Sequence, residues 1–516
     1  MAKAIMLQGT SSNVGKSILA AALCRIFFRE GYRVAPFKSQ NMALNSGATP
    51  DGGEIGRAQL VQAYAAGIKP RVEMNPVLLK PTGHASSQVV VLGRPVGNVG
   101  ARKYHGDFNQ QLWKKVEEAY AALDREFEII VIEGAGSPAE VNLKKNEIAN
   151  MRVAQLANAP VLLVADIDRG GALASVVGTL ELLESEERDR VAGIIINKFR
   201  GDLDLLKPAL EFLENKTGKP VLGVIPYISD HGLPEEDSVY FEGVKNRDTE
   251  NDEVEIAVIK LPCISNFTDF DALKHEVGVN LRFVDDKEDL GNPDLIIIPG
   301  SKSTISDLLW LRKQGLEEAI KSLVKEGTPL VGICGGYQIL GQKISDPEHV
   351  ETDQEVIDGF GLLPIRTIFK NTKKTNQVEG EVTGTGPFLE TIQGLKVKGY
   401  EIHMGDSYVR GKSVFKITRR GGESVNINDG ALSSDGLIWG TYIHGILDND
   451  LFRQHVLSIL RKRRGLDANI NGLNFEAYQE QCFNSLAEQV ARHLDLSRLA
   501  EIMGLERPLE GDKFEA

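Results

Sequence analysis

The sequence predicts an α/β protein with an N-terminal parallel-sheet domain that carries a phosphate loop (P-loop), a second α/β domain and a helical C-terminal tail. Short apolar runs alternate with helix-like stretches in both halves of the chain, as expected for strands buried on both faces of a parallel sheet. A polar stretch at 242–253 separates the two series, and the pattern turns helical from about residue 450. We therefore expect domains at 1–243 and 254–450, and a helical extension at 451–516.

The composition limits the class of protein. A chain of 516 residues is too long for one hydrophobic core, which supports more than one domain. The net charge of −13 argues against nucleic acid or an anionic membrane as the main partner. We find no apolar run of membrane-spanning length and no signal peptide in the N-terminal residues. The four cysteines form no C-x-x-C pair, so we expect a reduced, cytoplasmic protein.

The first chemical motif is "GTSSNVGKS", residues 9–17, between an apolar run and a helical stretch. Glycines let backbone N–H groups turn onto phosphate oxygens, and a helix N-terminus adds positive potential. In such a loop the lysine reaches the β- and γ-phosphates and the serine holds Mg²⁺. The strict pattern places a glycine where Thr10 stands, so this loop is a variant, and a plain glycine turn is the alternative. The candidate ATP-binding residues here are Gly9, Thr10, Asn13, Gly15, Lys16 and Ser17.

Two further polar residues follow buried strands in this half. Glu133 ends the strand of "EIIVIEGAG", where a carboxylate could hold Mg²⁺ beside the phosphates, together with Ser17. A salt-bridged or helix-capping glutamate is the alternative. Asn197 ends the strand of "IIINKF" and could bind the adenine edge, unless it only caps a loop. The loop and the E-G-A-G stretch resemble dethiobiotin synthetase and its relatives, which activate carboxyl or carbamate groups with ATP.

The second motif is "GICGGYQIL", residues 332–340, where an apolar run meets a predicted helix in a tight turn. Such a turn exposes Cys334 as a nucleophile, and the helix N-terminus favours a thiolate and supplies an N–H group for an oxyanion. His444 in "WGTYIHG" is the candidate base. The alternative is a cysteine that only packs, which is what we expect of the three other cysteines.

This half resembles the class I glutamine amidotransferase family. The resemblance implies that Gly300 and Ser301, in "IIIPGSKST", and Gly335 surround the oxyanion, and that Gln338 binds glutamine. The usual triad has a glutamate two residues after the histidine, a place that Ile446 takes here. Either another carboxylate orients the histidine, or a Cys–His dyad suffices, as in the cobyrinate-modifying branch of the family.

A P-loop domain followed by a glutaminase domain resembles the cobyric acid synthase family over nearly the whole chain. The most specific stretches are "FKSQNMALNS" (37–46), "GGEIGRAQ" (52–59) and "NPVLLKPTG" (75–83). The resemblance implies amidation of the b, d, e and g carboxylates of adenosylcobyrinic acid a,c-diamide, with one glutamine and one ATP for each, and with Mg²⁺. The residues by themselves support only an ATP- and glutamine-dependent ligase.

Four residues in these stretches are candidates for binding. Lys38, Asn41 and Lys80 suit a carboxylate or phosphate substrate, and Glu54 suits a metal. Each of them taken alone could equally be a structural residue.

Two alternatives remain open at this level. One is a related amidotransferase for the a and c carboxylates or for a cell-wall precursor. The other is a non-enzymatic partitioning-type ATPase, a class that usually carries an extra lysine where Thr10 and Ser11 stand here. The resemblance implies small-molecule partners (ATP, glutamine and a corrinoid polycarboxylate), and the sequence says nothing about oligomeric state.

Overall fold

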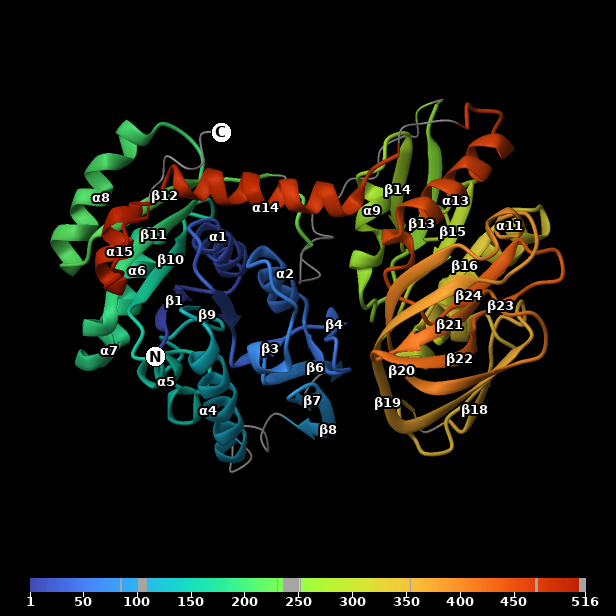
Figure 1. Ribbon diagram of the computed structural model, residues 1–516, viewed down its shortest axis with the longest axis horizontal. Coiled ribbons are helices and arrows are strands. Elements are labelled where there is room, and N and C mark those ends of the chain that lie inside the picture. Colours follow the sequence, from blue (N-terminus) through green and yellow to red (C-terminus); the bar gives the residue numbers. More distant parts are fainter. Residues whose placement is uncertain are drawn as a thin grey trace. The chain divides into compact units, whose positions relative to one another are not determined.

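The computed structural model describes residues 1–83, 86–100, 109–229, 231–234, 250, 252–352, 354–468 and 472–509 (Figure 1). Most of the expected linker at 242–253 lies outside these residues.

The chain forms two compact units that do not follow the order of the sequence. The first unit comprises Met1–Ala43, Ile55–Pro234 and Gln479–Ala516, and the second comprises Leu44–Glu54 and Glu235–Tyr478. The expected limits put 44–54 in the first domain and kept the tail apart from it. The structure instead gives 44–54 to the second unit and the end of the tail to the first.

The first unit is built on a six-stranded parallel sheet with the order β12-β11-β10-β1-β9-β2. Its strands are β1 (Lys3–Gly9), β2 (Val34–Phe37), β9 (Ile129–Glu133), β10 (Val161–Asp166), β11 (Val191–Phe199) and β12 (Val221–Pro226). Alternate residues of β1 enter two different hydrophobic cores, Ile5 and Leu7 in one and Ala4 and Met6 in the other. Because successive side chains of a strand point to opposite faces, both faces of this sheet are covered, as the apolar runs predict.

Helices from both ends of the chain cover the sheet. One core receives α1 (Lys16–Arg29) and residues of the last two helices, α14 (Phe475–Ala491) and α15 (Leu496–Met503). The other core receives α4 (Asn109–Glu126), α5 (Met151–Leu156), α6 (Ala172–Leu182) and α8 (Leu203–Thr217). The predicted helical C-terminal region is therefore confirmed, and its last part helps to form the first unit.

Smaller elements complete this part of the chain. They are β3 (Gln40–Met42), β6 (Val77–Gly83), β7 (Ser86–Val91) and β8 (Arg94–Gly100) in one sheet, α2 (Arg57–Ala65), α7 (Ser185–Arg190), and the short 3-10 helices η1 (Val72–Met74) and η3 (Lys144–Asn146). A separate two-stranded sheet joins β4 (Ser46–Ala48) to β5 (Glu54–Gly56).

The second unit contains another six-stranded sheet, with the order β14-β13-β15-β16-β24-β23. Its strands are β13 (Val254–Ile259), β14 (Val279–Val284), β15 (Leu295–Ile298), β16 (Leu330–Ile333), β23 (Ala431–Leu432) and β24 (Ile438–Thr441). All pairs are parallel except the one between β23 and β24. The helices of this unit are η5 (Phe267–Phe270), α9 (Asp271–Lys274), α10 (Thr304–Lys313), α11 (Leu316–Lys325), α12 (Gly335–Ile339), η6 (Glu390–Ile392), η7 (Ile446–Asp448) and α13 (Asp450–Arg463).

A mostly antiparallel sheet packs into the same hydrophobic core, and the sequence did not predict it. It comprises β17 (Lys343–Ser345), β18 (Val356–Asp358), β19 (Ile365–Val382), β20 (Lys396–Val409), β21 (Phe415–Arg420) and β22 (Glu423–Asp429). The α/β class with two parallel sheets is confirmed, with this sheet as an addition.

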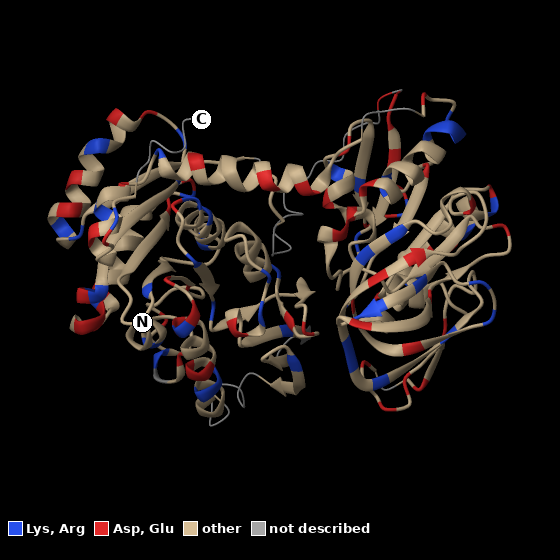
Figure 2. Ribbon diagram, in the orientation of Figure 1, with Lys and Arg blue, Asp and Glu red and all other residues tan. Residues whose placement is uncertain are grey.

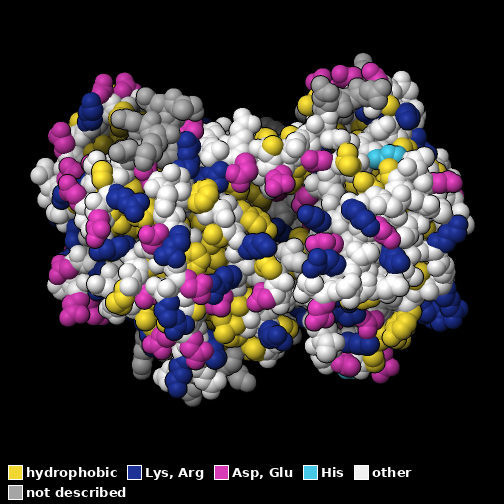
Figure 3. Space-filling model, in the orientation of Figure 1, with side chains coloured by type: hydrophobic (Ala, Val, Ile, Leu, Met, Phe, Trp, Pro, Cys, Tyr) yellow, Lys and Arg dark blue, Asp and Glu magenta, His cyan; other side chains and the backbone are white. Residues whose placement is uncertain are grey.

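Charge is distributed over both units. Basic and acidic residues occur on elements of both units in Figure 2, and both signs are interspersed on the face seen in Figure 3. Among the described residues, no helix is both long and apolar enough to cross a membrane. The expected cytoplasmic location stays a prediction.

Candidate active sites

The P-loop has the predicted strand–loop–helix structure. β1 ends at Gly9, and α1 begins at Lys16 directly after Gly15, whose φ is 98°. A Cβ atom at Gly15 would lie 2.2 Å from Nδ2 of Asn197, so this position needs glycine for its space as well as its conformation. The Lys16 ammonium donates to the carbonyl oxygens of Ser11 (3.0 Å) and Gly136 (3.1 Å), which holds it over the loop.

Residues of the neighbouring strands β10 and β11 form hydrogen bonds to the P-loop backbone. Asn197 Nδ2 donates to the Val14 carbonyl at 2.8 Å, so this amide fixes the loop backbone, and a contact with adenine stays a prediction. Lys198 donates to the Asn13 carbonyl at 2.6 Å and to Asp166 at 2.9 Å. The backbone N–H of Thr10 donates to a carbonyl of β10 at 2.9 Å.

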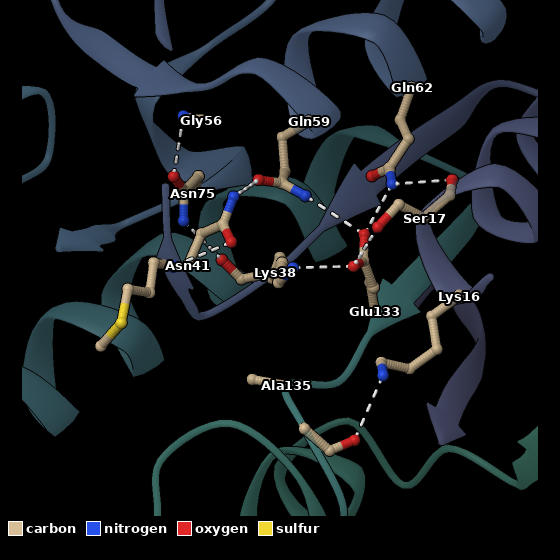
Figure 4. A network of polar contacts seen from close by, with 12 residues as sticks. Lys16, Ser17, Lys38, Asn41, Gly56, Gln59, Gln62, Asn75, Glu133 and Ala135 are labelled. Atoms are coloured by element: carbon tan, nitrogen blue, oxygen red, sulfur yellow. Dashed lines mark hydrogen bonds and ion pairs between the residues drawn. The ribbon is translucent and has the colours of Figure 1, made fainter. Parts of the chain in front are cut away.

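Glu133 is the centre of a buried polar network next to the loop (Figure 4). Its Oε1 accepts hydrogen bonds from Ser17 Oγ and Lys38 Nζ, each at 2.7 Å, and its Oε2 accepts from Gln62 (2.7 Å) and Gln59 (3.3 Å). Burial alone would raise the pKa of Glu133, but the charge of Lys38 and these hydrogen bonds outweigh it and lower the pKa. The structure thus brings the predicted magnesium ligands Ser17 and Glu133 together, with the carboxylate ionised.

The predicted substrate residues belong to or lie near this network. Lys38 pairs with Glu133, and Asn41 donates to Gln59 at 2.9 Å. Lys80 is buried on β6, the strand that pairs with the strand of Asn41. Their contact with a substrate stays a prediction. The sequence analysis missed Gln59 and Gln62, although their spacing of three residues on a helix was a readable signal.

Glu54 is assigned to a different compact unit from the other predicted metal ligands. It belongs to the second compact unit, whereas Ser17 and Glu133 belong to the first. Its carboxylate is fully buried and accepts from Lys373 Nζ (2.5 Å) and Ser46 Oγ (2.7 Å). A metal there would have to displace a buried ion pair, so its role as a ligand stays a prediction with a competing structural one.

No group of three or more His, Cys, Asp or Glu side chains that could hold a metal occurs within the described ranges. A nucleotide-bound Mg²⁺ does not require such a group, because phosphate oxygens and waters supply most of its ligands. The donor set of Ser17 and Glu133 fits this kind of site.

Cys334 stands at the turn between β16 and α12 with φ 52° and ψ −106°, which is a strained conformation for a residue with a side chain. The turn is possible because the two residues after Cys334 are glycines: a Cβ atom at Gly336 would lie 1.9 Å from the Ile298 carbonyl oxygen. The thiol lies 3.5 Å from the carbonyl oxygen of Ile402. This is the strained strand-to-helix turn expected of a nucleophile.

His444 has an acidic partner that the sequence analysis did not identify. Its Nδ1 lies 2.6 Å from Oδ2 of Asp269, and Oδ1 of the same carboxylate accepts the Gly445 N–H at 3.0 Å. Burial lowers the pKa of His444, but the charges of Asp269 and Cys334 outweigh it and raise the pKa to about 10. Of the two possibilities that Ile446 left open, the structure therefore supports a different carboxylate.

The predicted oxyanion residues lie close to Cys334 and His444. A Cβ atom at Gly335 would lie 2.8 Å from the Ser301 backbone nitrogen, and one at Gly300 would lie 3.0 Å from Cε1 of His444. The Ser301 hydroxyl donates to Asp307 at 2.6 Å, so its backbone N–H is the group available to an oxyanion.

Gln338 lies in the helix after Cys334, but its side chain is held inside the protein. Its Nε2 donates to the Met404 carbonyl and the Tyr442 hydroxyl, and its Oε1 accepts from Thr304, all at 3.1 Å. Direct binding of glutamine by this amide stays a prediction.

Comparison with known proteins agrees with the two sites. Residues 5–238 match the family of CobQ/CobB/MinD/ParA nucleotide-binding domains, and residues 255–452 match the CobB/CobQ-like glutamine amidotransferase domain. Each match contains one of the two candidate sites.

Whole-chain relatives are also found. The chain is 75% identical to the cobyric acid synthase of Moorella thermoacetica, with 99% of each chain covered. It is 56% identical to that of Pelotomaculum thermopropionicum and 55% identical to that of Desulfitobacterium hafniense, with 98% of each chain covered in both cases. A solved structure of PurLQS from Thermotoga maritima has a TM-score of 0.30 and 18% identity, covering 44% of this chain and 99% of that one. We draw nothing from so low a TM-score.

Proposed function

Because this chain belongs to the cobyric acid synthase family, we propose that it amidates the b, d, e and g carboxylates of adenosylcobyrinic acid a,c-diamide, a step in cobalamin biosynthesis. Each amide would consume one ATP and one glutamine. The observation that carries the proposal is the presence of two candidate sites in one chain, the network around Glu133 and the group formed by Cys334, His444 and Asp269. The first suits carboxylate activation, and the second suits the release of ammonia.

The P-loop unit would form an acyl phosphate. A substrate carboxylate oxygen attacks the γ-phosphorus of ATP, the bond to the bridging oxygen breaks, and ADP leaves. Lys16 compensates the charge on the transferred group. Ser17 and Glu133 would hold Mg²⁺, which adds positive charge at the phosphates when bound. Lys38 and Asn41 would help to place the carboxylate.

The second unit would supply the ammonia. The Cys334 thiolate attacks the side-chain carboxamide of glutamine, and the resulting oxyanion accepts N–H groups from Ser301 and Gly335. Protonated His444 gives its proton to the leaving ammonia, and Asp269 stabilises the imidazolium. Water then hydrolyses the glutamyl thioester. Ammonia attacks the acyl phosphate, so that an amide forms and phosphate leaves.

Mass spectrometry of the corrinoid tests the proposal. We expect that adenosylcobyrinic acid a,c-diamide, incubated with the protein, ATP, Mg²⁺ and glutamine, gains four amides, each replacing OH by NH₂. The cobyrinic acid that lacks the a and c amides is the comparison substrate. Amidation of that acid in preference to the diamide, or of neither corrinoid, would overturn the substrate assignment.

A further inference from the structure

We propose that residues 44–54 are a positioning element of the glutaminase site, and that they act through Asn266 on Asp269 and His444. The inference rests on the proposed function for the identity of the acid that is amidated. It does not depend on that identity for the chemistry of glutamine hydrolysis. This segment belongs to the second unit, although the residues before and after it in the chain belong to the first.

The segment is tied to the second unit at both ends. The Ser46 N–H donates to Oδ1 of Asn266 at 3.1 Å, and the Ala48 carbonyl accepts from Gln377 at 2.7 Å. Glu54 forms a buried ion pair with Lys373, in which the two side chains are 0% and 4% exposed. These contacts make the segment part of the unit that contains Cys334.

Asn266 connects the segment to the catalytic histidine. It is 3% exposed, has a φ of 56°, and precedes the short helix η5, which carries Asp269. Its own carbonyl accepts the Asp269 N–H at 3.0 Å. Asn266 therefore holds the Asp269 backbone with one oxygen and the segment with the other, and Asp269 holds His444.

Residues 263–265, directly before Asn266, also hold the oxyanion loop, which we define as residues 300–302. The Ser265 N–H donates to the Gly300 carbonyl at 2.9 Å, and the Lys302 N–H donates to the Cys263 carbonyl at 2.9 Å. The Lys302 ammonium is buried, which lowers its pKa, as does the charge of Lys373, while Glu54 acts in the opposite direction. Glu54, at the end of the segment, therefore acts electrostatically on Lys302, the residue after Ser301.

The flanks of the segment lead back to the nucleotide site. Asn41, three residues before it, donates to Gln59, five residues after it, and Gln59 donates to Glu133. When nucleotide and metal engage Glu133, these hydrogen bonds are expected to change. Since both ends of the segment continue into this network, glutamine hydrolysis would respond to the state of the synthetase site.

The test replaces Asn266 by two residues that tolerate a positive φ. Asn266→Gly removes the side-chain acceptor, and Asn266→Asp keeps it. Asn158→Gly is the matched control, because Asn158 has a φ of 44° in the first unit and is exposed. Glutamate release is measured as kcat and KM for glutamine, with and without ATP, Mg²⁺ and adenosylcobyrinic acid a,c-diamide. Amide formation from ammonium salt is measured in parallel.

Loss of one hydrogen bond corresponds to a fall in kcat of roughly twofold to tenfold. For Asn266→Gly we expect such a fall with little change in KM, a smaller stimulation by ATP and acid, and unchanged use of ammonia. Asn266→Asp and Asn158→Gly should resemble the wild type. Wild-type glutaminase kinetics in Asn266→Gly, equal losses in Asn266→Gly and Asn158→Gly, or a parallel loss of ammonia-dependent activity would overturn the proposal. Absence of corrinoid amidation would count against the proposed function only. The role of residues 44–54 would still be tested by glutamate release in the absence of ATP and the acid.

Discussion

Asp269 Oδ2 lies 2.6 Å from Nδ1 of His444, although 175 positions separate the two residues in the chain. A carboxylate at this nitrogen fixes the imidazole so that Nδ1 carries a proton and Nε2 is left for chemistry. We propose that Asp269 takes the part of the triad acid, in the absence of a glutamate two residues after the histidine.

Replacement of this carboxylate is the first prediction. Asp269→Asn keeps the shape but removes the charge, so glutamine-dependent amidation should fall by roughly 100-fold or more. Activity with ammonium salt should stay near the wild-type level. Rates with both nitrogen sources measure this. Asp285→Asn, at a half-exposed carboxylate of the same unit, is the control and should change neither rate. Wild-type use of glutamine by Asp269→Asn would show that a Cys–His dyad suffices.

Cys334→Ala gives a sharper separation of the two nitrogen sources. Without the thiol no thioester forms, so glutamine-dependent amidation should fall by several orders of magnitude. Ammonia-dependent amidation at alkaline pH should persist, because the acyl phosphate forms at the other site. Cys482→Ala, on a terminal helix, should keep both activities. A cysteine that only packs would make both activities fall together, at a cost of about 1–2 kcal/mol in stability.

The P-loop lysine should have the opposite pattern. Lys16→Ala removes the cation held over the loop, so amide formation should fall at least about 100-fold with glutamine and with ammonia alike. Glutamate release in the absence of ATP should remain, since Cys334 belongs to the other unit. Lys115→Ala, at an exposed lysine of α4, serves as the control. Normal amidation by Lys16→Ala would exclude this loop as the ATP site.

A pH-dependent effect on stability is expected at Asp429. Burial raises the pKa of this carboxyl to about 7, from 3.8, although hydrogen bonds from Thr441 and Tyr442 act against the rise. The folded state therefore binds more protons than the unfolded state between these two values, and stability falls as the pH rises through this window. Above about pH 7 the loss is complete.

Asp429→Asn removes that titration. The difference in thermal midpoint between the variant and the wild type should move in favour of the variant as the pH rises from 4 to 7, and then stay constant. Thermal unfolding followed by circular dichroism across this range measures it. A constant difference over the whole range would mean that folding leaves the pKa of Asp429 unchanged.

Local motifs explain which parts of the sites could be predicted. Gly15, Lys16 and Cys334 each stand at a junction of a buried strand and a helix, and such a junction is readable from a few neighbouring residues. The position of Glu133 could be predicted because ligands of parallel α/β sheets bind at the carboxyl ends of the strands, where Glu133 stands. The same reasoning gave the two parallel sheets.

The remaining parts depend on contacts between distant residues. No sequence motif around Asp269 marks it as the partner of His444. Its position depends on a turn at Asn266 and on hydrogen bonds to the loop of Gly300, which is distant in the sequence. Glu54 looked like a metal ligand because its actual partner, Lys373, follows more than 300 residues later. The long antiparallel strands β19 and β20 carry many polar residues, so they lack the continuous apolar runs by which the other strands were found.

The return of the chain's end to the first unit has a consequence for biosynthesis on the ribosome. Leu486, Val490 and Leu499 cover the same core as Leu222 and Ile225, and the Asp495 N–H donates to the Leu222 carbonyl at 2.7 Å. Translation reaches these last helices only after the whole second unit has been made. Until then α1 covers only part of one apolar face of the nascent N-terminal sheet, so chaperones meet a first unit that is completed only after the second has been made.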